Sequence, residues 1–294
     1  SLPAAAGATK SSKARIGRGK TGQYVMPDIP VEELIPPKEP LLNIFTFGWM
    51  EDGRLGYPPD VPSHIQSTPR PIAALRAVTK KHRDKIVPAT AADKRWVCKK
   101  VACGYRHTLL WMQNCYPEVG ADAKFEDGAP KKSFRLLLTG LNQRGLCEDK
   151  GSTLPVDLEW DQEEEPADIS AGNGYCVVVT KHGNTYSFGN GIYGVLGQGN
   201  TPGPGPSGGP QSSVPKPTQV MSLLRVTMTK VSCGGYHVVA TSSEGLLYSW
   251  GRNNVGQLSR GYESPYESTP SLVVGFEVGK ESPIQIACGE QHTL

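Results

Sequence analysis

The sequence lacks the patterns that would indicate a disulfide framework, a zinc site or a membrane span. Its seven cysteines are an odd number, and no two of them form a Cys-x-x-Cys pair, so neither a disulfide framework nor a zinc site is expected. A reducing compartment is therefore the expected environment. No apolar run approaches the roughly 18 residues that a transmembrane helix requires. We expect no metal, no cofactor and no membrane span.

Acidic residues are absent from residues 1–27, whereas five basic residues lie between Lys10 and Lys20. Ala, Ser and Thr fill much of the remaining sequence. This composition is typical of organelle transit peptides and their flanks, and it favours a mitochondrial location. The alternative is a basic tail of a nuclear or cytoplasmic protein.

Aromatic residues make up only 7% of the chain, while there are 34 glycines and 25 prolines among its 294 residues. Because these residues follow no collagen period, their abundance indicates many short strands joined by tight turns. The length is compatible with two ordinary domains or one large all-β domain.

Two short patterns alternate along the chain. The first is an aromatic-Gly pair, four residues, then Gly and a nearby Leu, with the two glycines five positions apart. Thr139 replaces the aromatic residue in one copy. The second is Val/Ile-x-Cys-Gly-x-x-His, and one of its copies has Ala171 for Cys and Tyr175 for His. Copies of the first pattern are Phe47–Gly56, Thr139–Leu146, Phe188–Gly197 and Trp250–Leu258, and copies of the second are Val101–Thr108, Ile169–Cys176, Val231–His237 and Ile286–Thr293.

The spacing of the two patterns predicts a repeated unit of four strands. The pattern glycines are 17 residues apart both from Gly172 to Gly189 and from Gly234 to Gly251. Between them lie short β-branched runs and Gly-containing turns, which predict hairpins. The Cys-Gly segment adds a third strand, and the stretches Pro217–Val220 and Pro270–Val274 add a fourth. Four short strands per unit are typical of a β-propeller blade, and blades can pack closely only where Gly leaves room.

At these residues the sequence resembles the regulator-of-chromosome-condensation repeat family, and Trp250–Leu258 and Ile286–Thr293 match its motifs almost residue for residue. The resemblance implies an all-β fold, a β-propeller of four-stranded blades, with about four blades here as part of a seven-bladed propeller. A closed four-bladed ring is the alternative. We expect residues 1–41 to be a basic, Pro-containing extension and 42–294 to be the propeller, with loop insertions near 113–132 and 199–217.

Within that family, the chain is most similar to the mitochondrial members, through the stretches Ala102–Leu110 and Gly140–Asn142. That resemblance implies association with the mitochondrial ribosome and its large-subunit RNA.

Motifs that would indicate catalysis are missing, so we expect no enzyme. Gly19-Lys20-Thr21 imitates the end of a phosphate-binding loop, but Ala14 stands where that loop needs Gly. No G-x-S-x-G elbow occurs. We interpret His107, His237 and His292 as structural residues that hold the backbone of the next blade, because Tyr175 breaks the series that a metal site would need.

Clustered basic residues are the candidate site for RNA or phosphate. They release counterions from nucleic acid and give affinity that depends on salt. Aromatic residues do not interleave with these charges, so stacking of single strands is not expected from these segments. The alternative is a solvated basic face. The candidate residues are Lys10, Lys13, Arg15, Arg18, Lys20, Arg76, Lys80, Lys81, Arg83, Lys85, Lys94, Arg95, Lys99 and Lys100.

An opposite block, Asp157–Asp168, contains seven acids and no base. It is interpreted as a solvated loop or as a site for a basic protein segment.

The function predicted from these features is a non-catalytic scaffold that binds mitochondrial ribosomal RNA and ribosomal or assembly proteins, in mitochondrial ribosome assembly. The alternatives are a guanine-nucleotide exchange factor for a small GTPase, which is the activity of the best-known family member, and a chromatin or ciliary interaction module. The fold does not choose among them, because function resides in surfaces grafted on a fold.

Overall fold

The computed structural model describes residues 44–49, 54–55, 65–71, 96–114, 134–140, 156–158, 160, 164–199, 213–275 and 283–294. All of them belong to the unit Leu42–Leu294. The predicted extension 1–41 lies outside the described residues, and its boundary stays a prediction. In the described part no helix is long and apolar enough to cross a bilayer.

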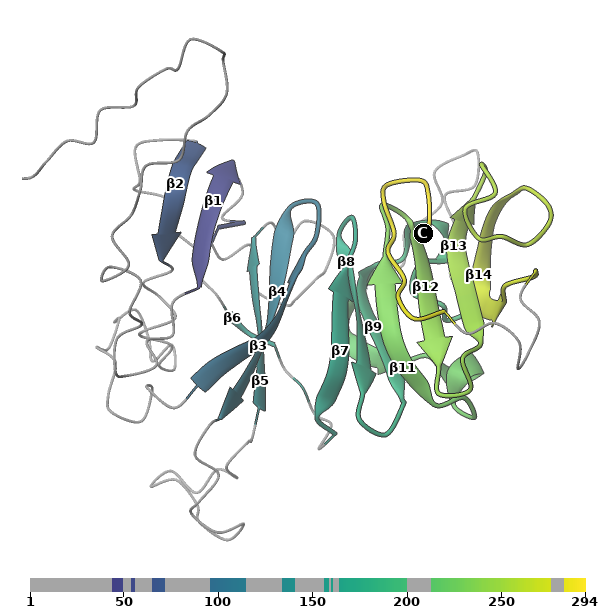
Figure 1. Ribbon diagram of the computed structural model, residues 1–294, viewed down its shortest axis with the longest axis horizontal. Coiled ribbons are helices and arrows are strands. Elements are labelled where there is room, and N and C mark those ends of the chain that lie inside the picture. Colours follow the sequence, from purple (N-terminus) through teal and green to yellow (C-terminus); the bar gives the residue numbers. More distant parts are fainter. Residues whose placement is uncertain are drawn as a thin grey trace, which may run out of the picture. The chain divides into compact units, whose positions relative to one another are not determined.

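Three four-stranded antiparallel sheets and one two-stranded sheet make up the described structure (Figure 1). In each four-stranded sheet the strands pair in chain order, so that every sheet is a meander. We call the sheets I to IV in chain order. Sheet I holds β1 (Phe45–Trp49) and β2 (Ile65–Pro71); sheet II holds β3 (Trp96–Cys103), β4 (His107–Asn114), β5 (Phe134–Gly140) and β6 (Val156–Asp157); sheet III holds β7 (Pro166–Ala171), β8 (Tyr175–Thr180), β9 (Thr185–Asn190) and β10 (Ser213–Gln219); sheet IV holds β11 (Met228–Cys233), β12 (His237–Ser242), β13 (Leu247–Asn253) and β14 (Ser264–Leu272).

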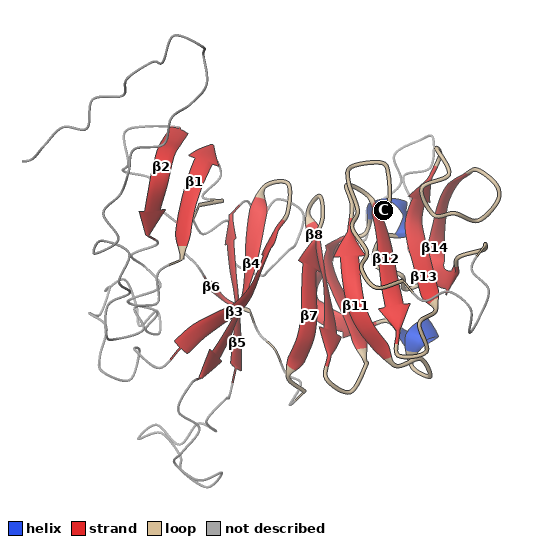
Figure 2. Cartoon of the chain, in the orientation of Figure 1, coloured by secondary structure: helices blue, strands red, loops and turns tan. Residues whose placement is uncertain are grey.

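The helical content of the described residues is limited to two 3-10 turns, η5 (Ile192–Gly194) and η6 (Met221–Leu223), as Figure 2 shows. After sheet IV, Cys288 and Thr293 form an isolated antiparallel bridge. This bridge repeats the pairing of the Cys-Gly motif with the following strand in sheets II to IV. The prediction of an all-β fold built from four-stranded blades is confirmed.

The two sequence motifs meet in the same register in each four-stranded sheet. His107 pairs with Gly140, Tyr175 with Gly189, and His237 with Gly251. The backbone of Gly251 has a φ of +105°, and an added Cβ there would lie 2.6 Å from the carbonyl oxygen of Tyr236. Glycine is therefore required at this position both by conformation and by space.

The central strand β8 is buried on both faces, because sheet III lies between two packed neighbours. Its residues Tyr175–Thr180 are all buried. Cys176 and Val178 face a core cluster shared with Leu109, Leu136 and Trp160 of the sheet II side. The alternate residues of β8 face a second cluster, shared with Val238 and Trp250 of sheet IV. The β-branched residues of β8 therefore form a strand whose alternate side chains pack into two different interfaces between sheets.

In sheets III and IV the aromatic residue of the first motif fills the space between sheets. Phe188 and Trp250 are completely buried, and the indole nitrogen of Trp250 donates a hydrogen bond to the carbonyl oxygen of Val195 at 2.8 Å. In sheet I the equivalent Phe47 is 64% exposed.

The fourth strands begin earlier than predicted. Observed β10 and β14 start at Ser213 and Ser264, although each contains two prolines. Proline is tolerated because these are the outer strands, where one edge needs no hydrogen-bond donor. The expectation of a loop insertion up to residue 217 is corrected accordingly, since 213–217 belong to β10. Gln113 and Asn114 likewise belong to β4.

Candidate functional site

We call the first strand of each four-stranded sheet, β3, β7 and β11, its inner strand. The glycines that directly follow these strands bring each inner strand close to the next. An added Cβ at Gly104 would lie 2.6 Å from the carbonyl oxygen of Gly172. An added Cβ at Gly172 would lie 2.6 Å from the carbonyl oxygen of Gly234, and one at Gly234 would lie 2.6 Å from that of Gly289. No side chain fits at such distances. The prediction that the Cys-Gly glycines permit close packing of blades is confirmed.

The residue three positions after each of these glycines reaches into the next sheet. The Nε2 atom of His107 lies 3.2 Å from the Sγ of Cys176, and Nε2 of His237 lies 3.0 Å from the Oγ1 of Thr293. The phenol of Tyr175 donates to the carbonyl oxygen of His237 at 2.8 Å. The sequence predicts a bond to the next blade's backbone. Tyr175 makes one, and the histidines also hydrogen-bond backbone of the next repeat, His107 at Tyr175 and His237 at His292, in addition to these side-chain contacts.

The His107–Cys176 pair combines the residue types of a nucleophilic dyad, but its environment excludes that role. Both side chains are buried, with 1% and 0% of their surface exposed. Burial lowers the pKa of His107 to about 4 and raises the pKa of the Cys176 thiol well above its ordinary value. At neutral pH both groups are uncharged, and no substrate reaches the sulfur. The pair therefore serves as an interface contact rather than a catalyst.

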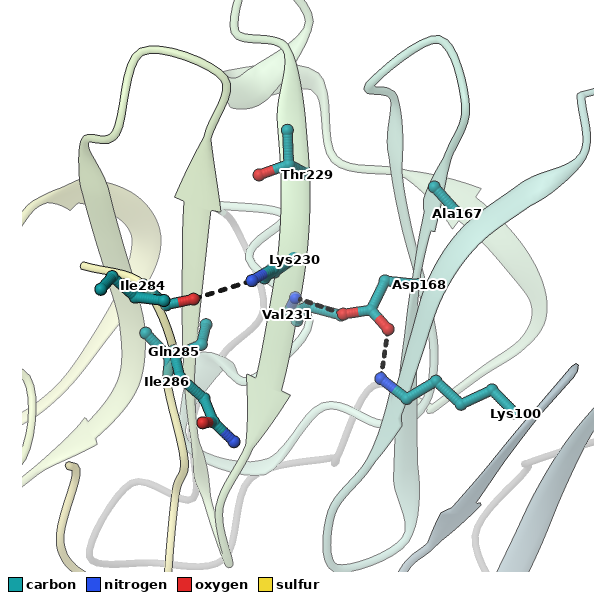
Figure 3. Close-up of a pocket in the computed structure, with 9 residues that line it drawn as sticks. All are labelled: Lys100, Ala167, Asp168, Thr229, Lys230, Val231, Ile284, Gln285 and Ile286. Atoms are coloured by element: carbon teal, nitrogen blue, oxygen red, sulfur yellow. Dashed lines mark hydrogen bonds and ion pairs between the residues drawn. The ribbon is translucent and has the colours of Figure 1, made fainter. Parts of the chain in front are cut away.

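A groove of about 550 Å³ lies along the inner strands of sheets II to IV and the segment that follows. Figure 3 shows its lining residues and their interactions. The charged groups at its centre are the ammonium of Lys100, the carboxylate of Asp168 and the ammonium of Lys230. The complete lining consists of Lys100, Ala167, Asp168, Thr229, Lys230, Val231, Ile284, Gln285 and Ile286.

Asp168 connects three consecutive sheets. Its Oδ1 forms an ion pair with Lys100 of β3 and accepts a hydrogen bond from its neighbour's amide. Its Oδ2 accepts a hydrogen bond from the backbone N–H of Val231 in β11 at 2.9 Å. Both carboxylate oxygens thus have partners, and at the centre of the groove in Figure 3 this side chain joins the neighbouring sheets.

Serine side chains extend the same arrangement along the inner strands. Ser170 Oγ accepts a hydrogen bond from the N–H of Cys233 at 2.9 Å, and Ser232 Oγ accepts one from the N–H of Cys288 at 2.9 Å. These N–H groups lie on strand edges with no further strand beside them. The preceding sheet therefore caps each free inner edge, which satisfies buried donors and blocks pairing with other chains.

Other polar groups that line the groove also bond within the chain. Lys230 donates to the carbonyl oxygen of Ile284 at 2.8 Å, and Thr229 donates to that of Thr241 at 3.0 Å. Among the described ranges, no group of three or more His, Cys, Asp or Glu residues is arranged to hold a metal ion.

Two of the fourteen candidate phosphate-binding residues lie within the described structure. Lys99 is exposed on β3. Lys100, next to it, has 40% of its side chain exposed and forms the ion pair with Asp168. The other twelve fall outside the described residues, so the phosphate-binding role of the set stays a prediction.

The described acids of the block Asp157–Asp168 all have partners within the chain. Asp157 pairs with Arg135, and Glu165 pairs with Lys181. Glu164 accepts hydrogen bonds from Thr180 and Asn184. These carboxylates and that of Asp168 therefore have a structural role that neither interpretation, a solvated loop or a site for a basic protein segment, included.

The capping residues Asp168, Ser170 and Ser232 were not predicted from the sequence. A signal for the serines is present, because Ser occupies the same position, two before the motif glycine, in two copies. Asp168 carries no such signal, since the equivalent positions hold Lys100, Lys230 and Gln285.

The repeated four-stranded sheets, joined through equivalent glycines, define a propeller-type repeat protein. A family model described as "Regulator of chromosome condensation (RCC1) repeat" matches residues 182–241 and 244–294. A second model of the same repeat matches residues 228–257. Residues 182–241 and 244–294 therefore carry RCC1 repeats.

Curated relatives carry these repeats within longer chains. The human probable E3 ubiquitin-protein ligase HERC6 is 29% identical over 209 residues, which cover 66% of this chain and 16% of HERC6. The ultraviolet-B receptor UVR8 of Arabidopsis thaliana is 26% identical over 221 residues, covering 75% of this chain and 39% of the receptor. The chain thus spans a minor part of the length of these relatives.

Solved structures share the fold at low sequence identity. The structure of yeast RCC1 (Prp20) bound by Kap60 matches with a TM-score of 0.60 and 20% identity, over 85% of this chain and 49% of that chain. Human WBSCR16 matches with a TM-score of 0.60 and 19% identity, over 86% and 54%. The Saccharomyces cerevisiae Prp20p structure, described with its binding to Gsp1p and histones, gives 0.50 and 21%, over 85% and 62%. These likenesses show the RCC1 propeller fold.

Proposed function

We propose that this chain is a non-catalytic RCC1-repeat scaffold that binds mitochondrial ribosomal RNA and ribosomal or assembly proteins, and that it acts in mitochondrial ribosome assembly. The observation that carries the proposal is the density of positive charge in two segments of the sequence. Residues 76–100 contain nine Lys or Arg against two Asp, and residues 1–27 contain basic residues without any acid.

The interior of the protein supports a scaffold rather than an enzyme. Its reactive side chains, such as the Cys176 thiol and the His107 imidazole, are buried in contacts between sheets. Asp168 is likewise engaged by an ammonium and two backbone N–H groups. Binding through clustered Lys and Arg requires no such groups, because phosphates are recognised by charge at the surface.

Sedimentation of mitochondrial lysate tests this proposal. We expect the full-length protein to sediment with ribosomal particles at low salt, and to move toward the top of the gradient after ribonuclease treatment or at raised salt. A protein that stays at the top of an untreated low-salt gradient contradicts the proposal. Imaging of the tagged protein separates a mitochondrial location from a nuclear or cytoplasmic one.

The second candidate is guanine-nucleotide exchange on a small GTPase. It is favoured by the fold likeness to Prp20p, whose structure was described with its binding to Gsp1p and histones. A propeller surface can displace the segments that hold a nucleotide without any acid–base pair. A nucleotide-release assay across a panel of small GTPases decides it, and no acceleration for any member removes this candidate.

A further inference from the structure

The loops at one end of sheets II to IV form a continuous surface. The turn after β3 contacts the next turn through the N–H of Tyr105, which donates to the oxygen of Gly172 at 3.1 Å. The N–H of Asn173 in turn donates to the oxygen of Gly235 at 3.1 Å. The loops after β9 and β13 lie at the same end, because the register places Gly189 beside Tyr175 and Gly251 beside His237.

This end carries tyrosine rings paired with guanidinium groups, and we call it the Arg–Tyr surface. Tyr105 is 64% exposed, and the Cζ of Arg106 lies 5.7 Å from its ring centroid. The Cζ of Arg252 lies 4.9 Å from the ring centroid of Tyr193. The Arg–Tyr surface is defined by Tyr105, Arg106, Tyr193, Tyr236 and Arg252.

The rings of Tyr193 and Tyr236 are held in place by their surroundings. Their centroids are 5.3 Å apart at an interplanar angle of 75°, and the phenol oxygen of Tyr236 accepts a hydrogen bond from Asn173 Nδ2 at 2.7 Å. The surface is thus organised before any partner binds, which reduces the entropy lost on binding.

The backbone of Tyr193 is in a conformation that a bulky side chain rarely adopts, with a φ of +58°. The motif does not require it, because Val255 at the equivalent position of sheet IV has no positive φ. Strain that persists at one copy of a repeat points to a role of that copy's side chain. Here the strained residue places an aromatic ring beneath Arg252.

Acidic residues are absent from most of the described turns and loops at this end. The turns 104–106, 172–174 and 234–236 and the loops 191–199 and 254–258 contain no Asp or Glu. Glu263 and Glu267 border these loops, and the exposed Glu290 lies in the next equivalent turn, where its carbonyl oxygen accepts a hydrogen bond from the N–H of Gly235 at 3.2 Å. Glu267 accepts hydrogen bonds from Tyr262 and Ser264.

We propose that the Arg–Tyr surface binds single-stranded RNA, with bases stacking on the tyrosine and guanidinium planes and phosphates meeting the arginine charges. This inference rests on the proposed function and gives it a second contact site, apart from the basic segments. Alternating aromatic and cationic side chains are the recurrent means of holding a single strand without reading its sequence. A duplex offers no base faces to these rings, and an acidic peptide would use only the guanidinium charges.

Fluorescence anisotropy with the full purified chain tests the proposal. The probe is a labelled oligouridine of about 12 nucleotides, within the range that single-strand sites cover. We expect Tyr105→Ala and Arg252→Gln each to raise the Kd at least roughly fivefold, the lower end of the effect expected when one stacking partner is lost. Tyr105→Trp, which keeps an aromatic plane, is expected to retain wild-type affinity. Because Tyr105 is 64% exposed, its replacement leaves the core intact.

Matched controls are Tyr262→Ala, an exposed ring that hydrogen-bonds Glu267, and Arg225→Gln, an exposed arginine in the connection between β10 and β11. Each should change the Kd by less than about twofold. If the wild-type chain binds the oligomer and both surface variants bind equally well, the surface proposal is wrong while RNA binding through the basic segments stands. Binding to polyglutamate or duplex RNA that is as tight as to oligouridine also overturns it. No binding of any RNA rejects both proposals.

Discussion

The phenol of Tyr175 donates a hydrogen bond to the carbonyl oxygen of His237 at 2.8 Å, joining the same repeat position in two consecutive sheets. The same phenol lies 3.0 Å from the carbonyl oxygen of Gly234. Tyr175 stands where the other copies of the motif have His. Its phenol reaches the backbone of the next sheet, as the imidazoles of His107 and His237 also do, so the exception in the sequence preserves the interface between sheets.

Replacing Tyr175 with Phe removes this donor from two buried carbonyl oxygens. We expect the free energy of unfolding to fall by about 2 kcal/mol, because the oxygen of Gly234 loses this donor without regaining water. The oxygen of His237 keeps the N–H of Gly234 as a donor at 2.7 Å. Urea denaturation followed by tryptophan fluorescence measures the change. Tyr262→Phe, at an exposed ring, is the control and should change the free energy of unfolding by less than about 0.5 kcal/mol. Equal effects of the two variants would contradict this interpretation of the interface.

Gly172→Ala tests the close approach of inner strands. The added methyl group would lie 2.6 Å from the carbonyl oxygen of Gly234, so we expect a loss of about 3 kcal/mol by overpacking. Gly256→Ala is the control, since its φ is +75° but nothing lies within 4 Å of the added Cβ. It should cost about 1 kcal/mol, from backbone conformation alone. If thermal or urea titrations show that Gly256→Ala lowers the free energy of unfolding more than Gly172→Ala does, close packing between sheets is not what requires glycine at position 172.

Asp168→Asn removes the charge that pairs with Lys100 and weakens the acceptor for Val231 N–H. We expect a loss of about 2 kcal/mol, because the carboxylate is largely enclosed, with 13% of its side chain exposed. Asp157→Asn breaks the ion pair with Arg135, in which the carboxylate is 46% exposed, and should cost less than about 1 kcal/mol. Urea titrations at low and high salt compare the two. If the two variants are equally stable, the contacts of Asp168 with neighbouring sheets do not stabilise the protein as the structure indicates.

Acidification should destabilise the protein through its buried histidines. Burial lowers the pKa of His107 and of His237 to about 4 from an ordinary 6.5. Between these values the unfolded chain binds protons that the folded chain does not, so stability is complete above about pH 6.5 and falls as the pH decreases toward 4. For His107 the loss between about pH 7 and pH 5 is about 2 kcal/mol.

Urea titrations from pH 7 to pH 5 measure this loss. His107→Gln should reduce the dependence. If His107→Gln fails to fold, NMR titration of the wild-type imidazole resonances gives the same information. A His107 resonance that titrates near pH 6.5 contradicts the buried, neutral state.

The repeated elements of this fold could be predicted because glycine at regular spacing indicates turns or close packing, and β-branched runs indicate strands. The equal spacing of the motif glycines predicts a repeated four-stranded unit, and the structure places Gly189 opposite Tyr175 in such a sheet. The burial of Phe188 and Trp250 follows from their place at the end of a hairpin strand. These predictions depend on local geometry, which the sequence carries directly.

Contacts between sheets could not be predicted in the same way. Asp168 belongs to a run of acids that favours an exposed loop, yet its carboxylate caps Val231 in the next sheet. Tyr105 and Tyr193 are distant in sequence and show no common pattern, and only the arrangement of the turns places them at one end. Such side chains gain their roles from neighbours that the chain supplies some 60 residues later.

Cross-linking of the protein to RNA in living cells tests the central claim most directly. The tagged full-length protein is irradiated in place, purified under denaturing conditions, and its attached RNA is sequenced. The account predicts strong enrichment of mitochondrial large-subunit ribosomal RNA over a mock purification, and a reduced yield for Tyr105→Ala. Recovery of no RNA above the mock level, or of nuclear and cytoplasmic RNA alone, would contradict it.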